Sequence, residues 1–323
     1  MLMRKTKSPT FNSSTPGSRR SILDRWIRRA FWVFSTLPTL LGVLILVALG
    51  VKSRPILLTH PVTTLLFGSA WKPQKGEFGF LPFISGTIWV TTVALVIAVP
   101  ICILTAIYLS EYASARIQRF IKPLLDLLAA IPSVVYGVWG VLAIVPWVQK
   151  SIAPFLGQWG NLFPIFSSTN PTGYSVFAGG VVLAVMIAPF IVAIAYEVLQ
   201  SVPFGLRQAS LALGATRWQT IKFAVFPKAA SGIFASIVLG CSRALGETMA
   251  VLMVVGNVPQ IPRSIFDAAY PLPALIANNY GEMMSIPLYD AALMAASLIL
   301  LIIVLGLNIF SILALRHILI EKT

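Results

Sequence analysis

The sequence predicts an all-α integral membrane protein with six transmembrane helices. Of its 323 residues, 57 % are hydrophobic and only 11 % are charged, and the mean hydropathy is +0.87. A soluble domain carries about 25 % charged residues, so this chain has too few polar side chains to cover a water-exposed surface. Its apolar residues form continuous runs of the length that crosses about 30 Å of hydrocarbon. They do not alternate as in the strands of a membrane β-barrel.

Each apolar run predicts one transmembrane helix. In chain order, the runs are residues 30–51, 84–110, 127–148, 175–199, 232–256 and 291–315. A basic tail, residues 1–29, precedes the first run, and its first 18 residues are rich in Ser, Thr and Pro and predict disorder. A cleaved signal peptide ending before Val51 is the competing interpretation, but the basic region is long and the run reaches spanning length.

The basic residues predict the orientation of the chain. Lys and Arg number 17 in the N-terminal tail, the second loop, the fourth loop (residues 200–231) and the C-terminal tail (residues 316–323). The other connections, residues 52–83, 149–174 and 257–290, hold 6. The positive-inside rule then places both termini and the two basic loops in the cytoplasm. The net charge of +14 is therefore interpreted as a topology signal and not as a nucleic-acid-binding surface.

The fourth loop predicts folded structure. Pro203 suits the first position of a helix, and Gly214 suits a left-handed C-terminal cap. Thr216, followed three residues later by a glutamine, matches a capping box that begins a second short helix, and Pro227 is expected to end it. A helix lying on the membrane surface is one interpretation, and a docking element for a soluble partner is the other.

The fifth apolar run carries two full charges, Arg243 and Glu247, four residues apart. A charge at the bilayer centre costs about 2.5–3.5 kcal/mol, and residues at i and i+4 share a helix face. The pair therefore either neutralises itself and fixes helix packing, or lines a path for an anion. Ser242 and Thr248 add hydroxyl donors, although helical Ser and Thr often bond their own backbone.

The chemistry of the pair suits one particular oxyanion. A guanidinium binds phosphate oxygens in a bidentate manner. Phosphate keeps a proton near neutral pH, because its second pKa is about 6, and a carboxylate can accept a hydrogen bond from that proton. Sulfate has no such proton, so Glu247 would repel it.

Three isolated acidic residues are expected near the cytoplasmic ends of the helices. They are Glu111, Asp126 and Glu197. We expect them to be solvated or paired with the basic residues of the second loop, which are Arg116, Arg119 and Lys122. A contact with a cytoplasmic ATPase is the alternative.

The fourth loop resembles the EAA loop of ABC importer permeases. In "QASLALGATRWQTIKFAVFP", Ala209, Gly214 and Pro227 match that pattern, Gln208 stands for the glutamate, and Ser210 stands for the second alanine. The substitution at 208 removes the negative charge that the pattern carries there.

The fifth run is similar to that of the phosphate-specific ABC permeases. The motif "RALGETMAV" followed by "GN" resembles the PstC-type subunit more than its PstA-type partner. The resemblance covers about residues 84–315 and implies the type I ABC importer permease fold. It also implies that a coupling helix in the fourth loop seats in a groove of the ATPase. The residues that match it are Arg207, Gln208, Ala209, Ser210, Gly214, Ala215 and Thr216.

The resemblance further implies a complex in the bacterial plasma (inner) membrane. Its other members would be a second permease subunit of the PstA type, a cytoplasmic ATPase dimer of the PstB type and a periplasmic phosphate-binding protein of the PstS type. The chain lacks the Gly-x-x-x-x-Gly-Lys-Ser/Thr loop of ATPases, so we expect no cofactor on it and ATP use by the partner. Its two histidines offer little material for a catalytic or metal site.

Three other functions are alternatives for this sequence. The nearest is an ABC permease for another oxyanion or an organic solute, against which "RALGETMAV" argues. The second is a stand-alone secondary transporter. Inverted repeats or a proton-relay chain in the sequence would favour that function, and neither is visible. A membrane enzyme acting on phosphorylated lipid would need a nucleophile, base or metal cluster, and none stands out.

Overall fold

The structure is a computed structural model that describes residues 18–160, 162–167, 170–282 and 285–320. The tail predicted to be disordered, apart from residue 18, and the last three residues lie outside this range. The chain divides into two units, residues 1–48 and residues 49–323. The described part of the first unit is helical and belongs to α1 (Ser18–Thr59). Its side chains from Trp26 to Ala48 are exposed, as expected for an apolar helix that contacts lipid.

Six described helices are long and apolar enough to cross a membrane. They are Trp26–Thr59, Leu81–Tyr112, Ser133–Gly157, Val176–Gln200, Arg217–Leu245 and Tyr289–Ala314. The number and type of these elements confirm the predicted all-α fold with six transmembrane helices.

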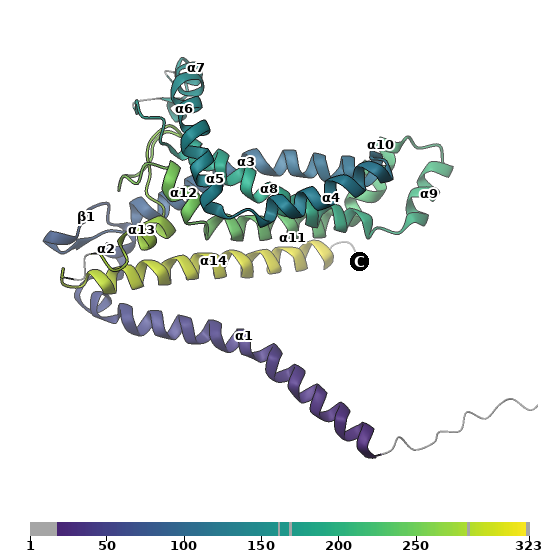
Figure 1. Ribbon diagram of the computed structural model, residues 1–323, viewed down its shortest axis with the longest axis horizontal. Helices are drawn as coiled ribbons and strands as arrows, with labels where there is room; N and C mark the ends of the chain where they lie inside the picture. Colours follow the sequence, from purple (N-terminus) through teal and green to yellow (C-terminus); the bar gives the residue numbers. More distant parts are fainter. Residues whose placement is uncertain (1–17, 161, 168–169, 283–284, 321–323) are drawn as a thin grey trace, which may run out of the picture. The chain divides into compact units, whose positions relative to one another are not determined.

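Long helices form the body of the second unit. Figure 1 shows α3 (Leu81–Ile107), α8 (Val176–Gln200), α11 (Phe226–Leu245) and α14 (Tyr289–Ile320) running alongside one another. The central helix is α8, whose most apolar 18-residue window is 61 % buried. Small residues let it approach α3 closely: a Cβ on Gly180 would lie 2.4 Å from Cγ1 of Val93. Close approach through small residues is the usual basis of helix packing in membranes.

The third span differs from its predicted range, residues 127–148. Its first part belongs to a separate helix, α4 (Ala115–Ala130), and Ile131 is extended. The span itself begins with α5 (Ser133–Trp139) and continues through π-helical turns to its end. The later pieces are α6 (Val145–Trp147) and α7 (Ala153–Gly157). Pro132 causes the break, because a proline excludes the residue before it from the helical region.

The fifth span also differs from its predicted range, residues 232–256. The helix starts earlier, because α10 (Arg217–Thr220) passes through a π-helical turn, residues 221–225, directly into α11. Pro227 lies in the first turn of α11 and does not end the helix, since the wider π turn makes room for its ring. The helix then ends at Leu245, and a short helix, α12 (Met249–Val254), follows.

Two connections that were predicted as loops fold together at one end of the bundle. Here α2 (Val62–Phe67) precedes a two-stranded antiparallel sheet, β1 (Trp71–Lys72) and β2 (Glu77–Phe78), and α13 (Leu272–Asn279) lies nearby. Among the described residues, the ring of Trp71 contacts the rings of Phe78, Phe80, Phe83 and Tyr289. We call these five rings the aromatic cap. The cap belongs to a second hydrophobic core, distinct from the one between the long helices.

The fourth loop lies at the opposite end of the bundle (Figure 1). It contains α9 (Phe204–Ala212) and α10. Gly214 has φ +84°, the predicted left-handed conformation. The predicted capping box is confirmed, since the Thr216 side chain accepts from the backbone N–H of Gln219, and the Gln219 side chain accepts from the N–H of Thr216. Pro203 lies one residue earlier than predicted, at the N-cap.

Candidate functional site

The fourth loop presents an inner and an outer face. Arg207 and Ser210, three residues apart on α9, are half-buried, whereas Gln208 and Ala209 are exposed. Ser210 and Thr220 join α9 to α10 through a hydroxyl–hydroxyl bond of 3.0 Å. Between the two helices, the N–H of Ala215 donates to the carbonyl of Ser210 at 3.3 Å. The loop is thus folded by its own hydrogen bonds.

The outer face of the loop is apolar. Phe204, Leu213 and Trp218 are 68 %, 89 % and 53 % exposed. Exposed apolar side chains gathered on a folded element mark an interaction surface. Arg217 and Gln219, which are also exposed, add polar groups beside them.

The inner face holds a nearly buried ion pair. The guanidinium of Arg207 lies 2.8 Å from Oε1 of Glu111, and the two side chains are 13 % and 11 % exposed. Glu111 follows α3 in a π-helical turn, residues 108–112. Sequence reasoning had assigned Glu111 to solvent or to the basic residues of the second loop. That assignment was wrong, because α9 folds back over the end of α3, and no local pattern signals this long-range contact.

Arg243 and Glu247 lie on the two sides of a helix break. Because α11 ends at Leu245, the two side chains do not share one helix face, as the predicted continuous helix required. Within the described residues, no ion pair joins them. Arg243 is exposed, and its Cζ lies 5.4 Å from the ring centroid of Phe190 on α8, which is cation–π geometry.

Glu247 helps to begin α12. Its Oε1 accepts a hydrogen bond of 3.3 Å from the N–H of Ala250. The half-buried side chain also lines a cavity of about 10 Å³, together with Thr87 and Thr91 of α3. That volume is close to the smallest that holds one water molecule, about 10–15 Å³. The Glu247 side chain therefore lies near α3 while remaining partly exposed.

The two predicted hydroxyl donors have partners within the chain. Ser242 donates to Oδ1 of Asn308 on α14 at 3.1 Å. Thr248 donates to the carbonyl of Gly246 at 3.2 Å. The four predicted residues are thus gathered around one helix break, and Phe190 and Asn308 complete the site. Sequence reasoning missed both, since each is an ordinary residue of an apolar helix.

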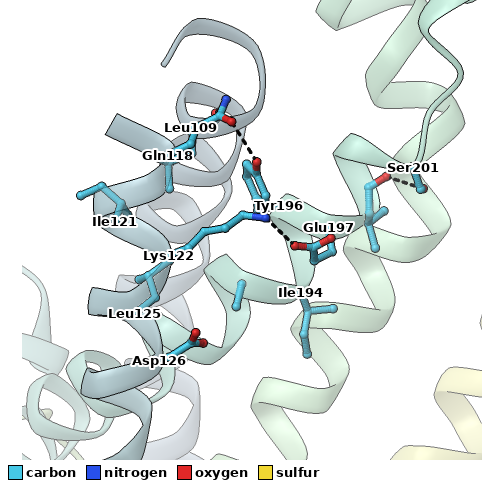
Figure 2. A pocket seen from close by; sticks show the side chains of 12 residues that line it. Leu109, Gln118, Ile121, Lys122, Leu125, Asp126, Ile194, Tyr196, Glu197 and Ser201 are labelled. Carbon is cyan, nitrogen blue, oxygen red and sulfur yellow. Dashed lines mark hydrogen bonds and ion pairs between the residues drawn. The ribbon is translucent and has the colours of Figure 1, made fainter. Parts of the chain in front are cut away.

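A pocket lies where α4 meets α8. Its volume is about 540 Å³, and Leu109, Ile121, Leu125 and Ile194 supply much of its apolar lining (Figure 2). Lys122 and Glu197 point toward each other there and form an ion pair of 3.0 Å. The pKa of Lys122 is raised above its ordinary value, mainly by the hydrogen bond to Glu197. The predicted pairing of Glu197 with a basic residue of the second loop is confirmed.

The "GN" motif forms the wall of a larger pocket toward the end that carries the aromatic cap. Gly256 and Asn257 both have positive φ, +95° and +53°. Asn257 donates from Nδ2 to the carbonyl of Leu252 at 2.8 Å. The pocket has a volume of about 1100 Å³, and Arg263 supplies a cation to its lining. The motif therefore ends α12 and opens the space beyond it.

Comparisons with known proteins agree on one family. Residues 98–319 match the family described as "Binding-protein-dependent transport system inner membrane component". The chain is 38 % identical to the "Phosphate transport system permease protein PstC" of Pasteurella multocida, over 77 % of this chain and 82 % of that protein. It is 37 % identical to the "Probable ABC transporter permease protein YqgH" of Bacillus subtilis, over 81 % of each chain.

Solved structures agree on the fold. A bacterial ABC transporter for import of the acidic polysaccharide alginate aligns with a TM-score of 0.57 at 18 % identity, covering 91 % of this chain and 98 % of that chain. An inward-facing MetNI methionine ABC transporter aligns with a TM-score of 0.51 at 21 % identity, covering 74 % and 94 %. The predicted permease fold of ABC importers is thereby confirmed.

Proposed function

Because the chain belongs to the binding-protein-dependent transport system inner membrane components, we propose that it is the PstC-type permease subunit of an ATP-driven phosphate importer. The similarity to phosphate permeases extends over most of the chain. Members of this family are transport subunits, and a separate ATPase supplies the energy. The partners would be a PstA-type permease, a PstB-type ATPase dimer and a PstS-type phosphate-binding protein.

The charge pattern supports an orientation in the plasma membrane. The fourth loop and both termini would face the cytoplasm, because these segments carry most of the Lys and Arg residues. The aromatic cap, built partly from residues 52–83, would face the binding protein. The apolar outer face of α9 and α10 would seat on the ATPase, with Gln208 in the place of the glutamate of the family pattern.

Arg243 and Glu247 would form the phosphate path. The observation that carries this proposal is their separation at the helix break, which leaves the guanidinium without a carboxylate partner among the described residues. The cation–π contact with Phe190 uses no hydrogen bond of the guanidinium, so its N–H donors would be available to an oxyanion. Glu247 would then accept the proton that phosphate carries and that sulfate lacks.

The test is phosphate uptake by reconstituted vesicles that contain all four kinds of subunit, with sulfate as competitor. Loss of a donor aimed at a developing or bound anion costs about 10²–10³-fold in enzymes, and we expect a loss of that order for Arg243→Gln. Glu247→Gln should weaken the rejection of sulfate. Assembly and ATP hydrolysis should persist in both variants. Normal transport by both would show that the two charges lie outside the path.

A further inference from the structure

Arg207 is bonded to two separate parts of the second unit. Its Nε and Nη2 donate to the carboxylate of Glu111, with distances of 2.8–3.3 Å. Its Nη2 also donates to the carbonyl of Leu199 at 2.8 Å, and its Nη1 donates to that of Val202 at 2.5 Å. The guanidinium therefore joins α9 to the end of α3 and to the end of α8.

Glu111, which accepts these bonds, is also fixed in place by hydrogen bonds. Glu111 accepts a further hydrogen bond of 3.1 Å from the hydroxyl of Ser110. Gln118 of α4 donates to the carbonyls of Leu109 and Ala113 at 3.0 and 3.2 Å. Gln200 of α8 donates to the carbonyl of Ser110 at 3.3 Å. The π-helical turn that carries Glu111 is thus fixed by two neighbouring helices, so it offers a firm anchor.

The second half of the fourth loop, α10, continues directly into α11. From Arg217 to Leu245 the chain is one helix of 29 residues, which is about 43 Å at a rise of 1.5 Å per residue. Arg243 lies near its far end. Between this long helix and α9 stands Gly214, in a left-handed conformation with φ +84°. The loop therefore consists of a segment fixed to α3 and α8 and a segment continuous with the proposed phosphate path.

We propose that Arg207 is a positioning residue that transmits movement of the docked ATPase from α9 into α3 and α8, with Glu111 as its anchor. This inference rests on the proposed coupling role of the loop. With the ion pair in place, α9 moves together with the ends of α3 and α8, so that a push on the loop displaces these helices as well as α10, to which Ser210 and Thr220 join α9. Without it, the push passes only to α10 and α11, and ATP is hydrolysed without moving α3 and α8.

The chain contains a matched control for this contact. Lys122 and Glu197 also form an ion pair between neighbouring helices, but their side chains are 49 % and 69 % exposed. Exposed pairs contribute little, whereas removing one partner of a buried pair leaves an uncompensated charge. A variant of each pair therefore separates the effect of the contact from that of a lost charge.

The experiment measures phosphate moved per ATP hydrolysed in the full reconstituted complex, for Arg207→Gln, Glu111→Gln, Arg207→Lys and the control Lys122→Gln. Coupling between two sites commonly changes the affinity at one of them by at least about fivefold. We expect a decrease of that size for Arg207→Gln and Glu111→Gln, with ATP hydrolysis retained. Arg207→Lys keeps the charge but cannot reach both carbonyls, so its ratio should be intermediate. Lys122→Gln should match the wild type.

An unchanged ratio in assembled Arg207 and Glu111 variants would overturn the proposal. If the two Gln variants do not assemble, Arg207→Lys decides, and failure of all three to assemble would assign the pair to folding alone. If the wild-type complex moves a different oxyanion, the proposed phosphate specificity is refuted, and the ratio of that oxyanion to ATP is compared between the variants and the wild type instead.

Discussion

The hydroxyl of Ser242 donates to Oδ1 of Asn308 at 3.1 Å, which ties α11 to α14 one residue before Arg243. Asn308 is itself held by a bond of 2.8 Å from its Nδ2 to the carbonyl of Val304. The position of the guanidinium along the bundle therefore depends on a side chain from the last helix. This bond also occupies the hydroxyl that the sequence offered as a substrate donor.

We expect Ser242→Ala to lower stability and to spare most phosphate uptake. Hydrogen bonds between membrane helices contribute about 0.6–1.7 kcal/mol, and the variant loses one such bond. Thermal unfolding of the purified complex measures the effect. Ser236→Ala is the control, because among the described residues the Ser236 hydroxyl bonds only the carbonyl of Ile233 in its own helix. Unchanged stability with abolished uptake would instead place Ser242 in direct contact with phosphate.

Gly214→Ala should destabilise the fourth loop through the backbone alone. A Cβ at this position would meet nothing within 4 Å, but φ is +84°, and the left-handed conformation costs an L-residue about 1–2 kcal/mol. Gly205→Ala on α9 is the control, since its Cβ also meets nothing within 4 Å and its helical position favours alanine by about 0.5–1 kcal/mol. Thermal unfolding should therefore shift in opposite directions for the two variants, and equal shifts would refute the backbone explanation.

Gly180→Ala should loosen the contact between α3 and α8. The new Cβ would lie 2.4 Å from Cγ1 and 2.8 Å from Cβ of Val93, and Val is stiff at χ1, so the helices must separate. Overpacking of this kind costs about 1–3 kcal/mol. Gly306→Ala on α14, where nothing lies within 4 Å, is the matched control. Comparable unfolding temperatures for the two variants would contradict the close packing.

The Lys122–Glu197 ion pair should lose its effect in alkali. The pKa of Lys122 is raised above its ordinary value, chiefly by the hydrogen bond to Glu197. A raised pKa means that the folded state holds the proton more tightly, so the contribution is complete below the ordinary lysine pKa of about 10.4. It disappears as the pH rises through the raised value. The stability difference between wild type and Lys122→Gln, measured by thermal unfolding, should be constant from pH 7 to 9 and shrink above about pH 10.4. A difference that persists there would mean that the charge of Lys122 is irrelevant.

The sequence predicted the helices of this protein better than their interruptions. Apolar runs and caps are local signals, which is why six spans and the turn at Gly214 could be read directly. The break after Leu245 has no local cause as strong as a proline, because Gly246 alone is tolerated in membrane helices. The break therefore depends on contacts with the rest of the fold. For that reason the spacing of Arg243 and Glu247 wrongly indicated that they share one helix face.

The partners of charged residues were predictable only in part. Glu197 forms an ion pair with Lys122 of the second loop, as predicted. Glu111 instead pairs with Arg207, which is 96 residues away in the chain. The EAA-like pattern places Arg207 among the residues of the coupling helix, which is expected to contact the ATPase. The side chain of Arg207 is instead turned inward, since the helix periodicity of α9 places Arg207 and Ser210 on one face.

The aromatic cap has a consequence for the order in which the chain is made. Trp71 emerges early during synthesis, but its partner Tyr289 follows some two hundred residues later. The same holds for Thr87, whose hydroxyl accepts from the N–H of Leu272. Contacts between such distant segments form late, and exposed apolar surface attracts chaperones and proteases until they do. A chain that ends before α13 would thus lack both Leu272 and Tyr289, and the apolar surface of its cap would stay uncovered.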